Sequence, residues 1–255
     1  MPEVLYKKKE HIAYISLNRP ESLNAVTRTM VRELAKIWVD FRDDSNLWVA
    51  VLSGEGRSFC AGADVKEMEV GKWQFSKSLL FGDERAGPSN YKVWKPIIAA
   101  LHRHVFGGGL WLALECDIRI AADDTMIGAP EPRVGLPTLF TPFLSDFVAR
   151  GIAEELLLTA NPIDAQRAYQ VGLVNKVVPR DQLLSEATAM AEKVCENGPL
   201  SIWAMKEILH RSRDMDYESS LALLKEVATP IFNAEDTVEA RQAFIEKRKP
   251  RWRVR

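Results

Sequence analysis

The sequence predicts an α/β fold that ends in a region made of helices. Two observations lead to this prediction. In the first half of the chain, short apolar runs alternate with a segment whose apolar residues recur every three or four positions, as buried strands alternate with amphipathic helices. Beyond Gly151 the pattern is mostly helical. At 255 residues, the chain is long enough for one large α/β unit with a sizeable core.

Four apolar runs in the first half are expected to form strands, three of them buried on both faces. They are residues 11–17 (HIAYISL), 48–54 (WVAVLSG), 96–101 (PIIAAL) and 117–122 (DIRIAA). Between the first two runs, residues 27–41 place Val31, Leu34 and Trp38 on one face, which predicts a helix. A polar stretch at residues 71–90 precedes the third run.

Three consecutive glycines, Gly107, Gly108 and Gly109, lie between the last two of these runs. Residues 110–114 are expected to form a helix that begins directly after them. A strand, a glycine loop and a helix N-terminus then follow one another, which brings main-chain N–H groups and a positive dipole to one point. This succession predicts a reactive site.

The second half is expected to contain six helices. Residues 153–159 (AEELLLT) form the first, and Asp164 and Asp181 are expected to cap the next two. Gly172 ends one of these helices and Gly198 follows the other. The last three are marked by apolar residues at helical spacing: Ile202, Met205 and Leu209; Leu221, Leu224 and Ala228; Ala240, Ala243 and Phe244.

Charge and cysteine content exclude several classes of protein. The 34 Lys and Arg residues against 35 Asp and Glu give a formal charge of −1, so no overall field attracts nucleic acid or an anionic membrane. The cysteines, Cys60, Cys116 and Cys195, are odd in number and lack metal-ligand spacing, which favours a reducing compartment without disulfides or metal. No apolar run has the length of a signal peptide or a membrane span, so the predicted location is the cytoplasm.

Several motifs resemble the crotonase superfamily, the enoyl-CoA hydratase and isomerase family. They are NRPESLNA (18–25), SFCAGADVKEM (58–68), FGGGLWLALECDIRIA (106–121), APEPRVGL (129–136), PIDAQRAYQVGLVNKVV (162–178) and AFIEKRKPRW (243–252). The resemblance implies a spiral of ββα units over residues 1–197. Residues 198–255 would be a helical region of the same domain, or an extension that mediates trimerisation and closes over coenzyme A. It also implies homotrimers, often paired into hexamers.

The two glycine-containing loops suit chemistry on an acyl-CoA thioester. Removing a proton next to the thioester, or adding a nucleophile across its conjugated double bond, places negative charge on the carbonyl oxygen. Small residues let that oxygen approach main-chain N–H groups closely. By similarity to the family, the two donors are the amides of Ala63 and Gly108, and Glu131 in the PEP segment is the acid/base that moves the proton.

Three departures from the family pattern bear on the reaction. Family hydratases carry a second glutamate where this chain has Trp111, which disfavours hydration and favours a 1,3 proton shift run by one carboxylate. Leu139, Phe140 and Phe143 replace a glycine-rich turn; they either line a drier acyl pocket or pack a loop onto the core.

The third departure is HRH, residues 102–104, where the family tends to have Asn-Gly-Tyr. His102 or His104 could supply a proton-transfer group, or these side chains could hold the loop through hydrogen bonds. His104, Trp111 and Phe140 are the residues predicted to line the substrate pocket.

Coenzyme A enters as part of the substrate, and no permanently bound cofactor or metal is expected. By resemblance, Arg19 and Lys66 lie near the adenosine and pyrophosphate, while Phe244 and Lys247 close over the nucleotide. The preferred activity is enoyl-CoA isomerisation. Open alternatives are hydration or dehydration of an unusual acyl group, such as a carnitinyl-type or cyclic dienoyl-CoA, and acyl-CoA decarboxylation or hydrolysis. A non-enzymatic alternative is RNA binding, which the near-neutral charge disfavours.

Overall fold

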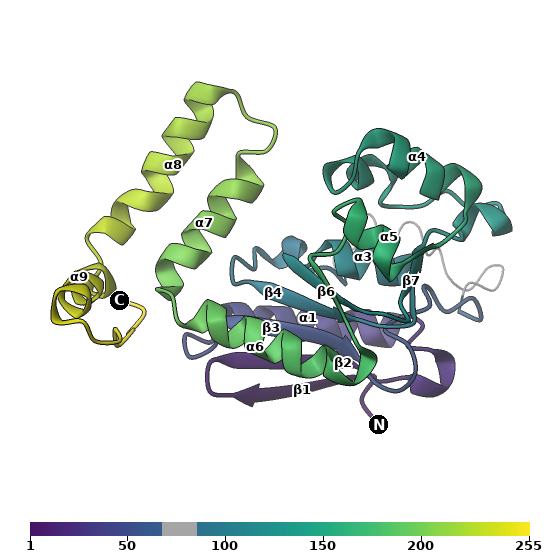
Figure 1. Cartoon of the computed structure of the whole chain (residues 1–255), viewed down its shortest axis with the longest axis horizontal. Coiled ribbons are helices and arrows are strands. Elements are labelled where there is room, and N and C mark those ends of the chain that lie inside the picture. The colour runs from purple at the N-terminus through teal and green to yellow at the C-terminus, as the bar shows by residue number, and fades with distance from the viewer. Residues whose placement is uncertain (68–85) are drawn as a thin grey trace.

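The chain forms two sheets with helices around them in a computed structural model that describes residues 1–67 and 86–255 (Figure 1). Met68 and residues 71–85 of the polar stretch lie outside these ranges. In the larger sheet the strand order is β1-β2-β3-β4-β6-β9, and in the smaller one β5-β7-β8. The strands are β1 (Val4–Lys9), β2 (Ile12–Leu17), β3 (Val49–Gly54), β4 (Ile97–Leu101), β5 (His104–Phe106), β6 (Ile118–Ala122), β7 (Met126–Gly128), β8 (Ile163–Asp164) and β9 (Lys176–Val178).

All four predicted strands are confirmed, as β2, β3, β4 and β6, and they run parallel to one another. The other strands were not predicted, because none of them shows an apolar pattern in the sequence. β1 pairs antiparallel with β2 at the sheet edge and carries three consecutive lysines, so it lacks an apolar pattern. β5, β7, β8 and β9 are two or three residues long, which is too short for a periodic signal.

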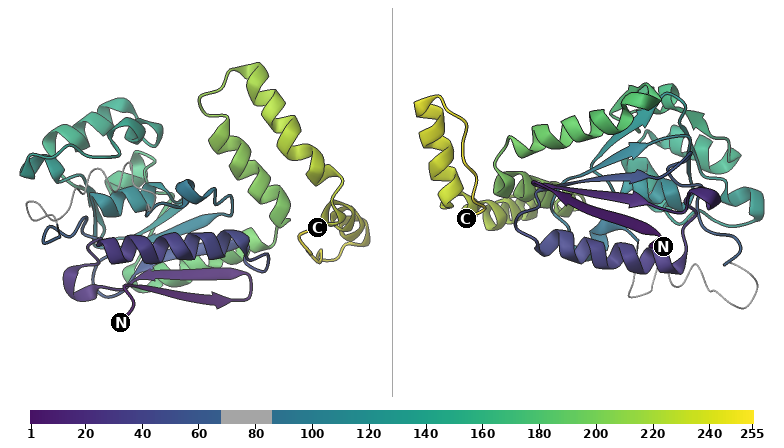
Figure 2. Two further views of the ribbon diagram at one scale, coloured as in Figure 1. Left: turned by 180° about the vertical axis from the view of Figure 1, so that it is seen from behind. Right: turned by 90° about the horizontal axis from the view of Figure 1, so that it is seen from below.

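The larger sheet lies between α1 (Arg28–Asp43) and α6 (Leu183–Cys195), as the right-hand view of Figure 2 shows. Successive residues of a strand point to opposite faces. Ala13 of β2 accordingly packs in the cluster that contains Trp38 of α1, while its neighbour Ile12 packs with Ala187 of α6. Burial on both faces explains the continuous apolar runs.

The helices predicted at residues 27–41 and 110–114 are present as α1 and α3 (Gly108–Leu114), and the six predicted in the second half are present with one error at a terminus. They are α4 (Arg150–Thr159), α5 (Ala165–Gln170), α6, α7 (Pro199–Arg211), α8 (Tyr217–Phe232) and α9 (Glu235–Glu246). Asp164 caps α5 as predicted, because its side chain accepts from Arg167 N at 2.7 Å. The predicted cap of α6 by Asp181 is wrong. Asp181 lies within a 3-10 turn, Arg180–Gln182, which ends with a hydrogen bond from Leu183 N to Arg180 O, and α6 begins at Leu183 with Gln182 at its N-cap position.

The last three helices project away from the sheets in Figure 1, and α7 anchors them. Lys206 Nζ donates to Asp117 Oδ2 at 2.7 Å and to the Lys95 carbonyl at 3.0 Å. Trp203 Nε1 donates to the Trp48 carbonyl at 3.2 Å. Since Lys95 is itself buried, the pKa of its ammonium falls to about 8. Among the helices of the described ranges, none is both long and apolar enough to cross a membrane.

Candidate active site

The loop after β3 is bound along one edge to β5, which brings the two glycine-containing motifs together. Phe59 N donates to His102 O at 2.9 Å, Cys60 N to His104 O at 3.0 Å, and Phe106 N to Cys60 O at 3.0 Å. This is the pattern of a short parallel pairing, and Cys60 forms a bridge with Val105. Two segments that are far apart in the sequence therefore have a fixed register.

On its other side the same loop pairs with Val26, and this pairing sets the direction of the Ala63 amide. Val26 N donates to Gly62 O at 2.8 Å, and Asp64 N donates to Val26 O at 3.0 Å. Because residues 62 and 64 make these bonds, the N–H of Ala63 points away from Val26. Within residues 1–67 and 86–255 it donates to no acceptor.

The main chain of Gly108 lies close to the Ala63 amide. A Cβ atom placed on Gly108 would be 3.7 Å from Ala63 N, so the two main-chain segments are close neighbours. Gly108 is the first residue of α3 (Gly108–Leu114), where an N–H has no partner inside the helix. It too lacks an acceptor in the described part of the chain. Two adjacent amide donors are thus available to a carbonyl oxygen.

Gly107 and Gly109 are required by close packing on either side of Gly108. A Cβ atom at Gly107, where φ is +52°, would meet Glu131 Oε1 at 2.5 Å. One at Gly109 would meet the Cys60 carbonyl oxygen at 2.5 Å. The first glycine lets the Glu131 carboxylate approach, and the other lets α3 pack against the loop that carries Ala63.

Glu131 follows β7 and begins a 3-10 turn, Glu131–Val134. Besides the contact of Oε1 with Gly107, its Oε2 accepts a hydrogen bond from Thr138 Oγ1 at 3.4 Å. Burial raises the pKa of the Glu131 carboxyl, and bonds from its own backbone N–H and from Thr138 oppose this increase. The carboxyl therefore holds its proton to a higher pH than a solvated glutamate does, which favours a role in proton transfer.

Trp111 lies on α3, one turn beyond Gly107, whose carbonyl accepts from its N–H at 3.0 Å. Its indole Nε1 donates to Glu115 Oε1 at 3.1 Å. The ring meets Phe140 and Phe143 edge to face, with centroids 6.2 and 6.3 Å away. Since the indole has one polar atom and Glu115 accepts from it, Trp111 presents hydrocarbon to its other neighbours.

Comparison with known proteins assigns the chain to a family. The family model described as enoyl-CoA hydratase/isomerase matches residues 7–255. The chain belongs to this family. A short-chain-enoyl-CoA hydratase of Clostridium acetobutylicum is 35% identical over 96% of this chain and 95% of its own. An (E)-benzylidenesuccinyl-CoA hydratase of Thauera aromatica is 35% identical over 99% of both chains.

Solved structures of the enoyl-CoA hydratase/isomerase family share the fold. That of an enoyl-CoA hydratase from Mycobacterium tuberculosis H37Rv has a TM-score of 0.92, with 36% identity over 99% of both chains. A second, of an enoyl-CoA hydratase/isomerase from Mycobacterium paratuberculosis, has a TM-score of 0.90 with 29% identity over 99% of both chains. The predicted crotonase-type α/β fold is therefore confirmed.

The histidines differ in their relation to this crotonase-type site. His102 is buried and is one of the residues around a separate hollow of about 530 Å³, with Ser16, Ser53 and Arg180. Its ring nitrogens have no hydrogen-bond partner within the described ranges, so its side chain does not hold the loop through hydrogen bonds there. Burial lowers its pKa to about 4, so this ring is neutral at pH 7. His104 Nδ1 lies 2.8 Å from Ser58 Oγ. The pKa of His104 is lowered mainly by burial and, to a smaller extent, by the positive charge of Arg103.

Arg103, between these histidines, adopts φ of +53° at the position where the family tends to have glycine. A left-handed backbone costs a side chain energy that glycine avoids. We expect Arg103→Gly to stabilise the protein by about 0.5–1 kcal/mol, which is the strain removed less the greater freedom of glycine in the unfolded chain, and to raise its Tm by about 1–4 °C. The hydrogen bonds from Arg103 N to Asp124 and from Met126 N to Arg103 O involve main-chain atoms that glycine retains. Thermal unfolding of the two proteins at equal concentration measures the difference, and a lower Tm for the glycine variant would contradict it.

Two of the four residues predicted to bind coenzyme A lie next to the Ala63 loop. Arg19 Nη1 donates to Asp64 Oδ2 at 2.8 Å, and Lys66 is an exposed residue whose N–H donates to Asp64 Oδ1 at 3.1 Å. Phe244 and Lys247 are at the end of α9, and Phe244 is 86% exposed. In all views of Figures 1 and 2, α9 lies at the opposite end of the chain from α3 and β7. One chain therefore does not bring all four together.

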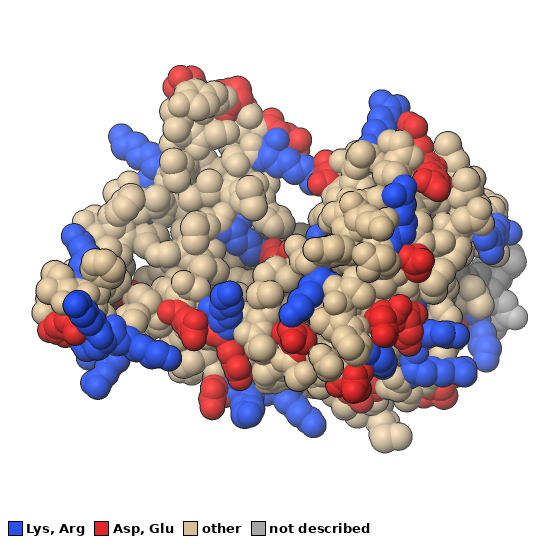
Figure 3. All heavy atoms as spheres, in the orientation of Figure 1, with Lys and Arg blue, Asp and Glu red and all other residues tan. Residues whose placement is uncertain are grey.

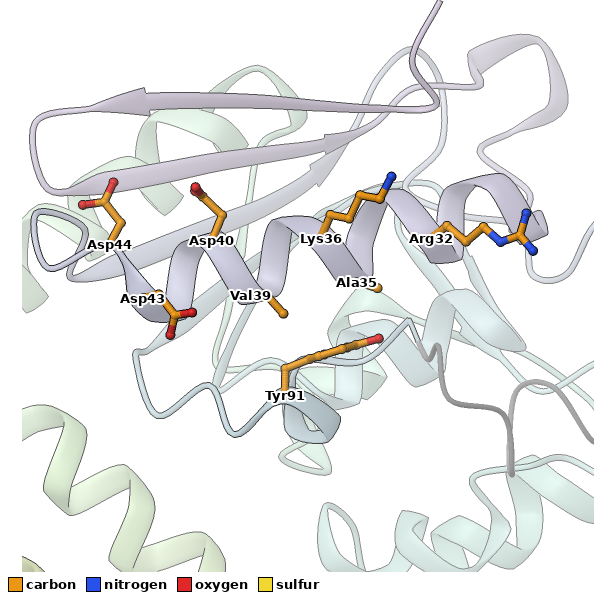
Figure 4. A pocket seen from close by; sticks show the side chains of 8 residues that line it. All are labelled: Arg32, Ala35, Lys36, Val39, Asp40, Asp43, Asp44 and Tyr91. Carbon is orange, nitrogen blue, oxygen red and sulfur yellow. The ribbon is translucent and has the colours of Figure 1, made fainter.

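Another hollow of the described ranges, about 720 Å³, lies along α1 (Figure 4). Figure 4 shows Arg32 and Lys36 toward one end, Asp40, Asp43 and Asp44 toward the other, and Tyr91 opposite. Lys8 pairs with Asp40 and Asp44, and Arg42 pairs with Asp43. The acidic residues of this hollow are all engaged in ion pairs at the surface. The Ala63 and Gly108 amides with the buried Glu131 carboxylate are therefore the better candidate for the active site. No cluster of three or more possible metal ligands occurs within the described ranges.

Two residues of the site were not predicted, Glu115 and Thr138. Glu115 follows Trp111 by one helical turn, a spacing at which side chains meet. Its other oxygen accepts from Ser89 N at 3.1 Å, so it joins α3 to the segment that precedes β4. Thr138 offered no signal beyond its place in the segment that replaces the family's glycine-rich turn.

Proposed function

We propose that the protein isomerises an enoyl-CoA thioester by a 1,3 proton shift. Glu131 would remove a proton from C2 of a 3-enoyl thioester and return it to C4, leaving a 2-enoyl thioester. Negative charge on the carbonyl oxygen would be stabilised by the N–H groups of Ala63 and Gly108. The observation that carries this proposal is that, within the described ranges, the Glu131 carboxylate lies against the glycine loop, while Trp111 stands in the place of a second glutamate and the Glu115 carboxylate is bonded to Trp111 and Ser89.

Hydration is the second candidate, and the names of the relatives favour it. Several relatives are called hydratases, including those for short-chain and benzylidenesuccinyl thioesters. Hydration needs a group that holds and activates a water molecule beside the double bond. Trp111 cannot serve as this group, because its only N–H in the indole ring is already bonded to Glu115. A fixed water or His104 would have to fill this role. Acyl-CoA decarboxylation and hydrolysis could use the same two amide donors, but they are weaker candidates because no described residue of the site specifically favours either reaction.

The two candidates differ in products, which one experiment separates. The protein is incubated in deuterated water with 3-enoyl-CoA and 2-enoyl-CoA thioesters of several acyl lengths, and the products are identified by mass spectrometry. Isomerisation converts 3-enoyl-CoA into 2-enoyl-CoA without adding water, and any deuterium in the product measures how far the proton on Glu131 exchanges with solvent. If 3-hydroxyacyl-CoA is the main product, the hydration candidate is correct and isomerisation is not the principal activity.

Replacing Trp111 by glutamate tests the reasoning about the second carboxylate. We expect Trp111→Glu to raise hydratase turnover from a low level, because a second carboxylate could activate water. Trp111→Leu is the control, since it removes the ring without adding a carboxylate. The ratio of hydrated to isomerised product is measured for the wild type and both variants. High hydration by the wild type would show that the inference from the missing glutamate is wrong.

We also propose that the chains assemble as trimers or hexamers through residues 198–255. α8 and α9 expose apolar side chains that one chain leaves uncovered: Leu221, Leu224, Phe232, Val238 and Ile245. Phe244 and Lys247 would then serve the site of a neighbouring subunit, since α9 lies far from its own chain's site. Sedimentation equilibrium of the protein, with and without residues 235–255, gives the mass that tests this assembly.

RNA binding has less support than catalysis. The formal charge is −1, and acidic and basic side chains are interspersed over most of the face shown in Figure 3. A cytoplasmic location and the absence of a bound cofactor stay predictions from the sequence.

A further inference from the structure

We infer that Thr138 is a positioning residue, whose hydroxyl holds one oxygen of Glu131 so that the other faces the glycine loop. The inference rests on the proposed role of Glu131 in proton transfer. Thr138 Oγ1 donates to Oε2 at 3.4 Å, while Oε1 lies against Gly107, next to the Gly108 amide. The carboxylate is therefore held between a hydroxyl donor on one side and the loop on the other.

The chain reverses after Glu131, and this reversal brings Thr138 back to it. The 3-10 turn ends at Gly135, whose φ of +73° is a left-handed conformation that glycine adopts without strain. The Glu131 carbonyl accepts from Leu136 N at 3.1 Å and closes the turn. Seven residues beyond Glu131, Thr138 is only 6% exposed.

Thr138 is itself held in place. Its carbonyl accepts from Thr141 Oγ1 at 2.6 Å and from Thr141 N at 3.2 Å. These bonds fix the backbone just before a second 3-10 turn, Thr141–Asp146. A donor on a fixed backbone restricts the carboxylate to few orientations, which favours a productive geometry for proton transfer.

No charged side chain of the described ranges competes with this arrangement. Burial, the Glu131 N–H and the Thr138 hydroxyl account for the shift in the pKa of Glu131. Arg133, the cation in the same turn, directs its guanidinium to Asn161 Oδ1 at 3.1 Å. The Thr138 hydroxyl stabilises the ionised carboxylate, so its loss should raise the pKa of Glu131 further.

Thr138→Val tests the inference, because valine keeps the shape and removes the hydroxyl. Thr138→Ala is a second hydroxyl-free variant in case valine prevents folding, and Thr138→Ser keeps the donor. A hydrogen bond to a charged group implies a loss of about 10-fold to 100-fold in kcat for the hydroxyl-free variants, with KM changed less than twofold. The limb of the kcat/KM profile at low pH should move to higher pH, because the base becomes available only there. Thr138→Ser should restore both kcat and the position of the low-pH limb.

A direct titration of Glu131 separates this inference from the proposed activity. The protein is labelled with ¹³C-glutamate, and the Glu131 carboxyl resonance is identified by its absence from Glu131→Gln. A higher pKa in the hydroxyl-free variants, returned to the wild-type value by serine, supports the positioning role even if the wild type shows no isomerisation. An unchanged pKa together with unchanged kcat would overturn it, and so would equal losses in the serine and valine variants.

Discussion

Glu131→Gln is expected to lower kcat for 3-enoyl-CoA isomerisation by about 100-fold to 10,000-fold, the usual contribution of a general acid/base. Glutamine has the shape of the glutamate and can still accept from Thr138 Oγ1, so the loss is one of proton transfer. Turnover is measured under saturating substrate, and acyl-CoA binding is measured by calorimetry. Unchanged turnover would exclude Glu131 as the acid/base.

Glu131→Gln should also change how the free energy of unfolding depends on pH. Burial raises the pKa of Glu131 in the folded protein above its value in the unfolded chain. The stability linked to this group is therefore present below the unfolded pKa and lost as pH rises through the folded pKa. Glutamine does not titrate, so the difference in unfolding free energy between wild type and variant should change across that interval. Denaturant unfolding at several pH values measures it.

Gly108→Ala is expected to lower kcat by about 100-fold to 1,000-fold, because alanine keeps the N–H but its methyl group blocks the carbonyl oxygen, an effect comparable to the loss of one oxyanion donor. The new methyl group would stand 3.7 Å from Ala63 N, an ordinary contact, in the space that a carbonyl oxygen would occupy. The fold should tolerate it. Gly109→Ala is the contrasting variant, because its methyl would meet the Cys60 oxygen at 2.5 Å and destabilise the protein by about 1–3 kcal/mol.

Thermal unfolding and isomerase kinetics of both alanine variants distinguish the two effects. The Gly108 variant should keep the wild-type Tm and lose activity, while the Gly109 variant should lose Tm. If Gly108→Ala retains full turnover, the methyl group does not enter the space of the carbonyl oxygen, which contradicts the proposed position of the oxyanion beside the two amides.

The central strands and the helices could be predicted because each buries enough apolar residues to show its period. The run at residues 48–54 became β3 for this reason, and Thr27 begins α1 as an N-cap that accepts from Met30 N. The short strands β5 and β7 gave no such pattern. Their pairing is set by hydrogen bonds between segments far apart in the sequence, such as Gly107 N to Gly128 O at 3.1 Å.

The candidate site was predicted from motifs, and its contacts were not. The resemblance pointed to Ala63, Gly108 and Glu131, and the fold brings these three segments together. The bond from Thr138 to Glu131 depends on a chain reversal after Gly135, and the placement of α9 depends on the path of α7 and α8. Local sequence patterns do not encode such long-range geometry. Trp111 was predicted as a pocket residue, but its bond to Glu115 emerged only from the structure.

The pairing of the Ala63 loop with Val26 and β5 has a consequence for how this scaffold can change. Both proposed donors are main-chain amides whose spacing is set by backbone hydrogen bonds, and Trp111, Phe140 and Phe143 contribute only side chains to the neighbouring wall. Under the proposed function, substitutions in that wall would reshape the space for the acyl group without displacing the amides. Charge stabilisation and acyl selectivity would then be carried by separate parts of the chain, so that one could diverge while the other persists.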